Sequence, residues 1–526
     1  MTHDETRTNL DGLLAHGHSD RVGHDGLNAL GLMIDYATNL ADGAALERAI
    51  ERAEVLRPTL AAANDMAEFH FFLGNAWDEL CRLRRTAAGT TWEWKQPELE
   101  EANRSLRAAY ASEGFTSLPR YRRCQVLTNI GNHFDRVGRF IEAVDYWDRA
   151  LAIEPSFGMA LGNRGLGLYN YARHLYDQRH CAVFLRVARA SLLAAIERPL
   201  EGNALTFFRA TLERIDRAFK GKPPEGEPRF REYSLGRSKA ERKYRRTCLG
   251  RRLFLNPLND LGQYLIGARD ILTTPTMTTG INEGPRFQGF FNQLKQEYVS
   301  ARYLYVEGVN EPRRAHYSDR DVRLFDTLDY PVYGLAAEEV KLAFRMSYSV
   351  LDKVAFFLNE YLGLGVPERE VKFRTIWFNK RGAREGVLRA EFKDRRNSPL
   401  RGLYWLSLDL ADPSEELREA LEPEARELAE IRNHLEHKYL KLHSEGFHGE
   451  DHRQAPGFLA DTLSFSINRL AFEQKCLKML KLARAAIMYL SFAVQVEERR
   501  RRKERGAHGT MSMPLALDAL PDEWKR

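Results

Sequence analysis

A regular alternation of small and large residues near the middle of the N-terminal half constrains the fold most strongly. Seven positions carry the pattern: Leu127, Gly131, Phe134, Ala143, Trp147, Ala150 and Pro155. Small residues let two antiparallel helices approach closely and aromatic residues fill the space beside them, as in helical repeats of roughly 34 residues. This stretch therefore predicts one helical hairpin of a stacked array.

Weaker copies of the same pattern lie on both sides of this hairpin. They place matching residues at Leu46, Ala49, Ala53 and Pro58, at Leu73, Gly74 and Trp77, at Ala102, Leu106 and Ala109 across an insertion near 84–97, and at Leu161 and Gly165. The pattern resembles the tetratricopeptide repeat and predicts a solenoid of about four or five degenerate units over residues 25–218. Such a solenoid presents a surface to a protein, a peptide or a nucleic acid, and the sequence does not name that partner.

A proline-rich segment followed by a basic one separates the two halves of the chain. Residues 221–228 contain three prolines and cannot continue a helix, so we expect a linker and basic segment over residues 219–252. Basic residues neutralise phosphates and interleaved aromatic residues stack on unpaired bases. The candidate RNA-binding residues are Arg242, Lys243, Arg245, Arg246, Arg251 and Arg252. A solvated connecting helix is the alternative interpretation of this charge run.

The C-terminal half shows four apolar stripes with helical spacing. They comprise Phe291, Leu294, Tyr298, Ala301 and Tyr305; Leu342, Met346, Val350, Val354, Phe357 and Leu358, ending at Gly363; Leu421, Leu428, Ile431, Leu435 and Leu442; and Leu470, Leu477, Leu480, Ile487 and Leu490. Between the second and third, residues 371–378 and 403–410 are rich in aromatic and β-branched residues and predict a small β hairpin. The expected fold class is all-α, with a helical solenoid, a four-helix bundle and a small β insertion.

The third of these helices carries Arg432, Asn433 and His437. Histidine suits the general base that removes a proton from a ribose 2′-hydroxyl, and a guanidinium suits the charge that then develops on the phosphate. Asn433 lies four residues before His437, where its amide reaches the imidazole or a phosphate. Arg432 is roughly 140° around the helix from His437, so two copies of the helix are needed to aim both groups at one point.

An ordinary structural interpretation of the same residues also exists. Arg432 with Glu436, and Glu430 with His434, are pairs at a spacing of four residues that stabilise a solvated helix.

The pattern at Arg432, Asn433 and His437 resembles the R-N-x3-H motif of the HEPN superfamily, and 252–260 resembles the start of the HEPN region in long prokaryotic members with a tetratricopeptide-like front half. The resemblance implies a HEPN domain over 253–505 with a tail at 506–526, a homodimer, and metal-independent RNA cleavage that leaves a 2′,3′-cyclic phosphate. It also implies antiviral defence or a toxin-like stress response, with an antitoxin as a candidate partner. Tyr439 fits the H-x-Y extension in which a partner enzyme modifies the tyrosine.

Composition excludes several other classes of protein. The net charge is only +6 over 526 residues, so charge alone does not identify a nucleic-acid partner. The five cysteines are scattered without a C-x2-C pair, which argues against a disulfide framework and favours a reducing cytoplasm. His434, His437, His443, His448 and His452 lack a metal-ligand spacing. We expect no metal, no cofactor and no membrane span.

Two alternatives to a ribonuclease belong to other functional classes. One is a non-catalytic adaptor in which repeats and bundle bind proteins, with Arg432 and His437 as surface or interface groups. The other is a nucleotide-binding regulator, since some HEPN relatives are thought to bind nucleotides.

Overall fold

The structure is a computed structural model that describes residues 2–525 except 16–21, 91, 222–227, 229, 231, 281, 311–314, 326, 380–386, 411–420, 445–462 and 508–514. The helices are α1 (His3–Ala15), α2 (Gly23–Asn39), α3 (Gly43–Leu56), α4 (Ala63–Ala88), α5 (Pro97–Ala111), α6 (Arg120–Arg136), α7 (Phe140–Ile153), α8 (Gly158–Ala172), α9 (Gln178–Ile196), α10 (Ala204–Ala218), α11 (Lys239–Gly250), α12 (Arg286–Asn310), α13 (Leu335–Leu362), α14 (Ala390–Lys393), α15 (Ser398–Ser407), α16 (Ala425–His437) and α17 (Arg469–Ala507). The strands are β1 (Tyr439–His443) and β2 (Ser464–Asn468). The expected all-α class with a small β element is confirmed.

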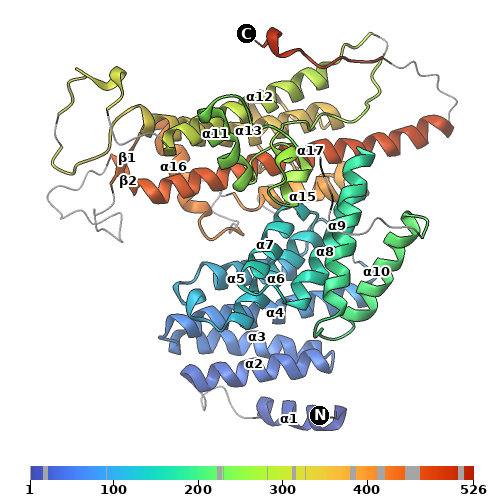
Figure 1. The fold of residues 1–526 in the computed structure, drawn as a ribbon. Coiled ribbons are helices and arrows are strands. Elements are labelled where there is room, and N and C mark those ends of the chain that lie inside the picture. Colours follow the sequence, from blue (N-terminus) through green and yellow to red (C-terminus); the bar gives the residue numbers. More distant parts are fainter. Residues whose placement is uncertain are drawn as a thin grey trace.

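Consecutive helices of the N-terminal half pack in pairs, α2 with α3, α4 with α5, α6 with α7 and α8 with α9. Figure 1 shows these pairs stacked in one array beneath the C-terminal helices. At Gly131 in α6, an added Cβ would lie 2.6 Å from the Trp147 indole of α7, so only glycine permits this approach. The small and large positions of the sequence pattern thus meet as expected; the assignment to tetratricopeptide repeats and the domain limits stay predictions.

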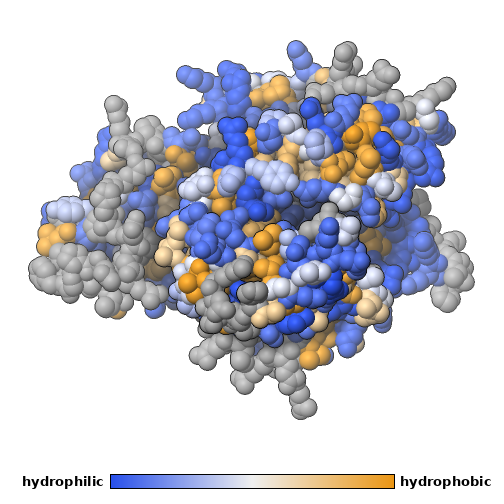
Figure 2. Space-filling model, turned by 90° about the horizontal axis from the view of Figure 1, so that it is seen from below, coloured by the Kyte–Doolittle hydropathy of each residue, from blue (hydrophilic) through white to orange (hydrophobic). Residues whose placement is uncertain are grey.

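Polar side chains cover much of the array's outer surface. Figure 2 views the molecule from the side of the N-terminal helices and shows hydrophilic residues over most of this view, with apolar residues in patches between them.

The C-terminal half is built around α17, which packs against α12, α13 and α15. The predicted helices are confirmed at α12, α13 and α17, and Gly363 ends α13 in the left-handed conformation with φ 66°. The stretch Arg469–Arg505 is long and apolar enough to cross a membrane, but 83% of its most apolar window is buried inside the protein. It is the central helix of the bundle core.

The predicted β hairpin at 371–378 and 403–410 is wrong. Residues 373–377 form turns, and Leu403 to Ser407 belong to α15, which Asn397 caps and Pro399 starts. Aromatic residues are abundant here because α15 is buried on all sides, and Trp377, Tyr404 and Trp405 are each at most 1% exposed. A helix that is buried on every side has apolar residues all around it, so its 3.6-residue period cannot be recognised in the sequence.

The third predicted helix is shorter than its apolar pattern suggests. α16 spans Ala425–His437, so Leu421 lies before it and Leu442 lies in β1. β1 pairs with β2 in parallel, from Tyr439 opposite Ser464 to His443 opposite Asn468. The β element of this protein therefore follows the motif helix directly.

The two halves meet at a surface that we call the joint, where α5, the α6–α7 turn and α7 contact α15, Asp409, Glu422 and α17. Its centre is a buried ion cluster. Asp409 Oδ1 accepts from Arg107 at 2.5 Å and its Oδ2 accepts from Arg139 at 2.7 Å, while Arg107 also bonds Glu422. Buried ion pairs therefore connect the two halves at the centre of the joint.

Backbone approach and aromatic packing complete the joint. A Cβ at Gly138, where φ is +90°, would lie 2.1 Å from the Ser398 carbonyl oxygen, so the α6–α7 turn fits only with glycine. Trp94, from the insertion between α4 and α5, packs against Trp377 and Tyr404, and its carbonyl accepts from Trp405 Nε1 at 3.0 Å. The insertion thus joins the N-terminal array to the C-terminal core.

Candidate active site

The motif helix α16 presents its apolar side to α13 and leaves its polar side accessible. Leu428 and Ile431 are at most 1% exposed, Arg432 and Asn433 are partly buried, and His437 is exposed at the last helical residue. Lys438 leaves helical geometry with φ −134° and ψ −139°, and the chain turns into β1. The end of the helix therefore places the His437 imidazole at the surface.

Arg432 is held beside α13 and does not point along α16 toward His437. Its guanidinium carbon lies 5.4 Å from the centre of the Tyr348 ring of α13, a cation–π distance. Its Nη1 donates to Asn433 Oδ1 at 3.4 Å. The structure thus brings Arg432 and Asn433 together.

Glu436 connects the motif face to α13. Its carboxylate accepts two hydrogen bonds from Arg345, each 3.2 Å long. The hydrogen bond from Arg345 lowers the pKa of Glu436 most, and the positive charges of Arg345, Arg432 and His437 lower it further. Arg345 therefore holds the exposed Glu436 carboxylate directly, and Arg432 and His437 act on it through their charges.

Arg345 is a site residue that sequence reasoning missed. It lies on a different helix, and its pairing with Glu436 replaces the expected pair of Arg432 with Glu436 along α16. The only sequence signal was a basic residue on the polar side of a predicted helix.

His434 and Tyr439 lie beside this face and make other contacts. His434 Nδ1 is 2.8 Å from the Glu430 backbone oxygen, and its ring packs on Phe465 of β2 at 5.5 Å. Tyr439 begins β1, is 42% exposed, and has its ring centre 5.7 Å from Lys441 Nζ. His434 is thereby held by its surroundings, while the Tyr439 side chain is accessible to solvent.

The predicted RNA-binding residues divide into an exposed and an engaged set. Arg242, Lys243 and Arg246 on α11 are exposed, and of these Arg242 also donates to the Gly236 and Arg237 carbonyls at 3.2 and 2.8 Å. Arg245 donates to Tyr233 and to the Ala268 carbonyl, each at 3.2 Å, and Arg251 bonds the Tyr305 hydroxyl. α11 packs against α12, whereas α16 packs against α13 and the two strands.

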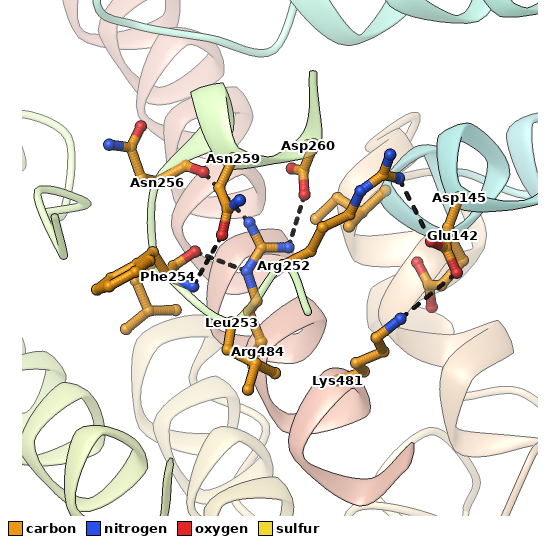
Figure 3. A network of polar contacts seen from close by, with 12 residues as sticks. Glu142, Asp145, Arg252, Leu253, Phe254, Asn256, Asn259, Asp260, Lys481 and Arg484 are labelled. Atoms are coloured by element: carbon orange, nitrogen blue, oxygen red, sulfur yellow. Dashed lines mark hydrogen bonds and ion pairs between the residues drawn. The ribbon is translucent and has the colours of Figure 1, made fainter. Parts of the chain in front are cut away.

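Arg252 belongs to a network that fastens the two halves together (Figure 3). It forms ion pairs with Asp145 and Asp148 of α7, the former at 3.3 Å. Arg252 follows the end of α11 with φ 57°, and the amide of Leu253 closes the helix on the Cys248 carbonyl at 2.9 Å. A non-glycine residue in this conformation is strained, and its side chain supplies the compensating contact.

The rest of the 252–260 segment is anchored to α17 by Arg484, as Figure 3 also shows. The Arg484 guanidinium donates to the Phe254 carbonyl at 2.7 Å, to Asp260 Oδ1 at 2.7 Å and to the Asn256 carbonyl at 3.2 Å. Asp260 also accepts from Tyr171 of α8 at 2.9 Å. This segment therefore holds the N-terminal array and the bundle in one arrangement.

Neither a metal centre nor a glycine-rich phosphate loop emerges among the described residues. No group of three histidine, cysteine, aspartate or glutamate side chains there is placed to hold a metal ion. His448 and His452 of the histidine-rich stretch lie outside the described residues. Added Cβ atoms at Gly162, Gly165 and Gly167 would meet Phe208, Leu192 and Trp147, so these glycines serve helix packing.

The chain combines an array of helical hairpins with a helical bundle that carries the partly exposed R-N-x3-H motif. Residues 278–497, which include α12, α13, α16 and most of α17, match the family model of the LA2681-like HEPN domain. This match supports a HEPN domain over residues 278–497. No curated protein and no solved structure matches the chain.

Proposed function

We propose that this protein is a metal-independent endoribonuclease in which His437 is the general base and Arg432 stabilises the phosphate. The observation that carries the proposal is the exposed imidazole at the end of α16, on a face with Arg432 and Arg345. In this mechanism His437 removes the proton of a ribose 2′-hydroxyl, the resulting oxygen attacks the adjacent phosphorus, and the 5′-oxygen leaves and takes up a proton from water. The products are a 2′,3′-cyclic phosphate and a 5′-hydroxyl.

The complete site is proposed to require two copies of the chain. Arg432 lies against Tyr348, and His437 projects from the last residue of the helix, so convergence of the two groups needs a second motif helix. The loop before α13 carries exposed apolar side chains: Tyr317 at 75%, Phe325 at 87% and Tyr330 at 71%. It adjoins β1, because Val332 donates to the Leu442 carbonyl at 2.6 Å. Large exposed apolar groups mark interaction sites, and we assign this surface to the homodimer.

The exposed residues Arg242, Lys243 and Arg246 are proposed to contact the RNA backbone, while Arg245, Arg251 and Arg252 support the fold. Tyr439 is the proposed regulatory modification target, and the N-terminal array is the proposed docking surface for an unknown protein or ligand. The proposed setting is the cytoplasm, in antiviral defence or a toxin-like stress response with an antitoxin partner.

The test compares wild type with His437→Ala and with the matched control His434→Ala on the same helix. Each protein is incubated with total tRNA and a synthetic single-stranded RNA in EDTA, and product ends are mapped. Loss of the general base lowers the rate about 10²–10⁴-fold, whereas His434→Ala stays within a few-fold of wild type. Equal rates for folded wild type and His437→Ala would reject this mechanism and favour the adaptor.

A dimer test is separate from the activity test. Phe325→Ser with Tyr330→Ser should convert a dimer to a monomer in light scattering coupled to gel filtration. Phe207→Ser is the matched control, since Phe207 is 65% exposed on α10.

A further inference from the structure

A basic cavity lies at the joint, away from the motif face. Its volume is about 600 Å³, within the range of small-molecule sites. Its lining comes from both halves of the chain: Trp92, Asp135, Phe140, Asn170, Arg173 and His174 from the N-terminal array, and Arg396, Ser398, Val496, Arg499, Arg500 and Lys503 from the C-terminal half. All six lining residues from the array lie outside the part that matches the HEPN family model.

The charge of this cavity is strongly one-sided. Arg173, Arg396, Arg499, Arg500 and Lys503 face a single lining carboxylate, Asp135. Arg500 is engaged by Glu497 at 3.0 Å and Glu504 at 2.5 Å. Within the part of the chain that the structure describes, Arg173, Arg396 and Lys503 have no carboxylate partner.

Cations gathered in a recess repel one another and attract an anion. Guanidinium groups are particularly suited to phosphate, which they bind through paired hydrogen bonds.

Beside the cations, the cavity offers flat rings and paired polar groups. The His174 ring stacks on Phe140 with a centroid distance of 5.1 Å and an interplanar angle of 7°. Burial lowers the pKa of His174 to about 4, and the charges of Arg173 and Arg499 contribute, so this ring is neutral near pH 7. Asn170 donates to Asp135 at 3.3 Å. A stacked ring and an amide–carboxyl pair are suited to a planar base and its hydrogen-bonding edge.

We propose that this cavity binds a nucleoside polyphosphate, with Arg173, Arg396 and Lys503 on the phosphates and the His174 ring against the base. The ligand contacts the end of α8 and the C-terminal third of α17 at once, so its binding stabilises the docked arrangement of the two halves. The site is separate from the motif, and the proposal stands whether or not the protein cleaves RNA.

The experiment is titration calorimetry of the full-length protein with ATP, tripolyphosphate and adenosine, without added metal. ATP should bind at least five-fold more tightly than tripolyphosphate, and adenosine should bind most weakly. Arg396→Glu and Lys503→Glu should each weaken ATP binding at least ten-fold. The matched control is Arg502→Glu. Arg502 is exposed beside Lys503 on α17 and does not line the cavity.

Each other outcome overturns a defined part of the proposal. Absence of ATP binding, or an equal loss of affinity in Arg502→Glu, would reject the cavity as a specific site. Equal affinity for ATP and tripolyphosphate would reject the role of the rings. Circular dichroism and thermal unfolding verify that each variant is folded, and Arg396→Gln and Lys503→Gln replace any charge-reversal variant that is not.

Discussion

Arginines form ion pairs both at the joint and on the motif face, but in very different surroundings. Arg107 and Arg139 of the joint are 6% and 2% exposed, and Asp409 between them is 1% exposed. On the motif face, Arg345 is 42% exposed and its partner Glu436 is 32% exposed. A buried charge depends on its partner because water is absent, whereas an exposed charge is stabilised by solvent with or without one. Breaking an ion pair at the joint should therefore cost much more stability than breaking the Arg345–Glu436 pair on the motif face.

The largest expected effect comes from Asp409→Ala. Burial acts to raise the pKa of Asp409, but Arg107 and Arg139 overcome it and hold that pKa below its ordinary value. Removing the carboxylate takes one partner from each of two buried guanidinium groups, although Arg107 keeps Glu422 and Arg139 keeps Glu142. The free energy of unfolding should therefore fall by about 3 kcal/mol, the lower end for a broken buried ion pair. Urea unfolding followed by circular dichroism measures this difference. Glu436→Ala is the control. An equal loss of unfolding free energy in both variants would show that the buried and the exposed ion pairs contribute alike to stability.

A medium effect is expected at Arg252, where side-chain contacts and backbone strain oppose each other. Arg252→Ala loses the ion pairs with Asp145 and Asp148 but keeps the left-handed backbone, and should destabilise by roughly 1 kcal/mol. Arg252→Gly loses the same contacts but relieves strain of about 1 kcal/mol, so it should stay near wild type. Arg246→Ala on the preceding helix α11 is the control. A less stable glycine variant would show that the network matters more than the backbone.

Two residues of the basic cavity should affect the pH dependence of the free energy of unfolding in opposite directions. Burial lowers the pKa of His174 from 6.5 to about 4, so the unfolded chain takes up the proton first and stability is lost as pH falls from 6.5 to 4. Burial raises the pKa of Asp135 from 3.8 to about 6, so the folded chain takes up the proton first and stability is gained as pH falls below 6.

His174→Gln should therefore flatten the loss of stability between pH 6.5 and 4, and Asp135→Asn should steepen it. Urea midpoints at half-unit pH intervals measure both slopes. If the urea midpoints of both variants changed with pH as those of wild type do, neither group would titrate in this pH range.

The smallest effect is expected for Arg345→Ala on the motif face. Its ion pair with Glu436 is exposed to solvent, so the free energy of unfolding should change by less than about 1 kcal/mol. If Arg345 also assists the reaction, the same variant should lower RNA cleavage while unfolding at nearly the same urea concentration as wild type. A loss of stability as large as that of Asp409→Ala would place Arg345 with the structural arginines.

Sequence periodicity predicted the long helices well because each has one apolar side, as at Tyr298 of α12 and Val354 of α13. It failed at α15, because this helix is buried on every side and has no polar face to contrast with an apolar one. It also extended α16 to Leu442, although the alternation from Tyr439 onward suits the strand that the chain forms.

The motif could be read from the sequence because its residues lie within one helical turn and a half. Arg345 could not, since its nearness to Glu436 depends on how α13 packs against α16. The ion pairs of Arg252 with Asp145 and Asp148 of α7 depend on tertiary packing in the same way, and its role in RNA binding stays a prediction.

The bundle's central helix also has a consequence for the order in which the protein is made. α17 contains 39 residues and is about 58 Å long at 1.5 Å per residue. Its Lys475 and Lys478 contact Glu424 beside the motif helix, and its Tyr489 donates to Glu142 at the joint. Chains are synthesised from the N-terminus and fold as their segments emerge. When translation has reached residue 468, every other element of the bundle has been synthesised, but the helix that closes the bundle has not. During translation, the motif helix and the joint stay unfinished until the same late segment appears.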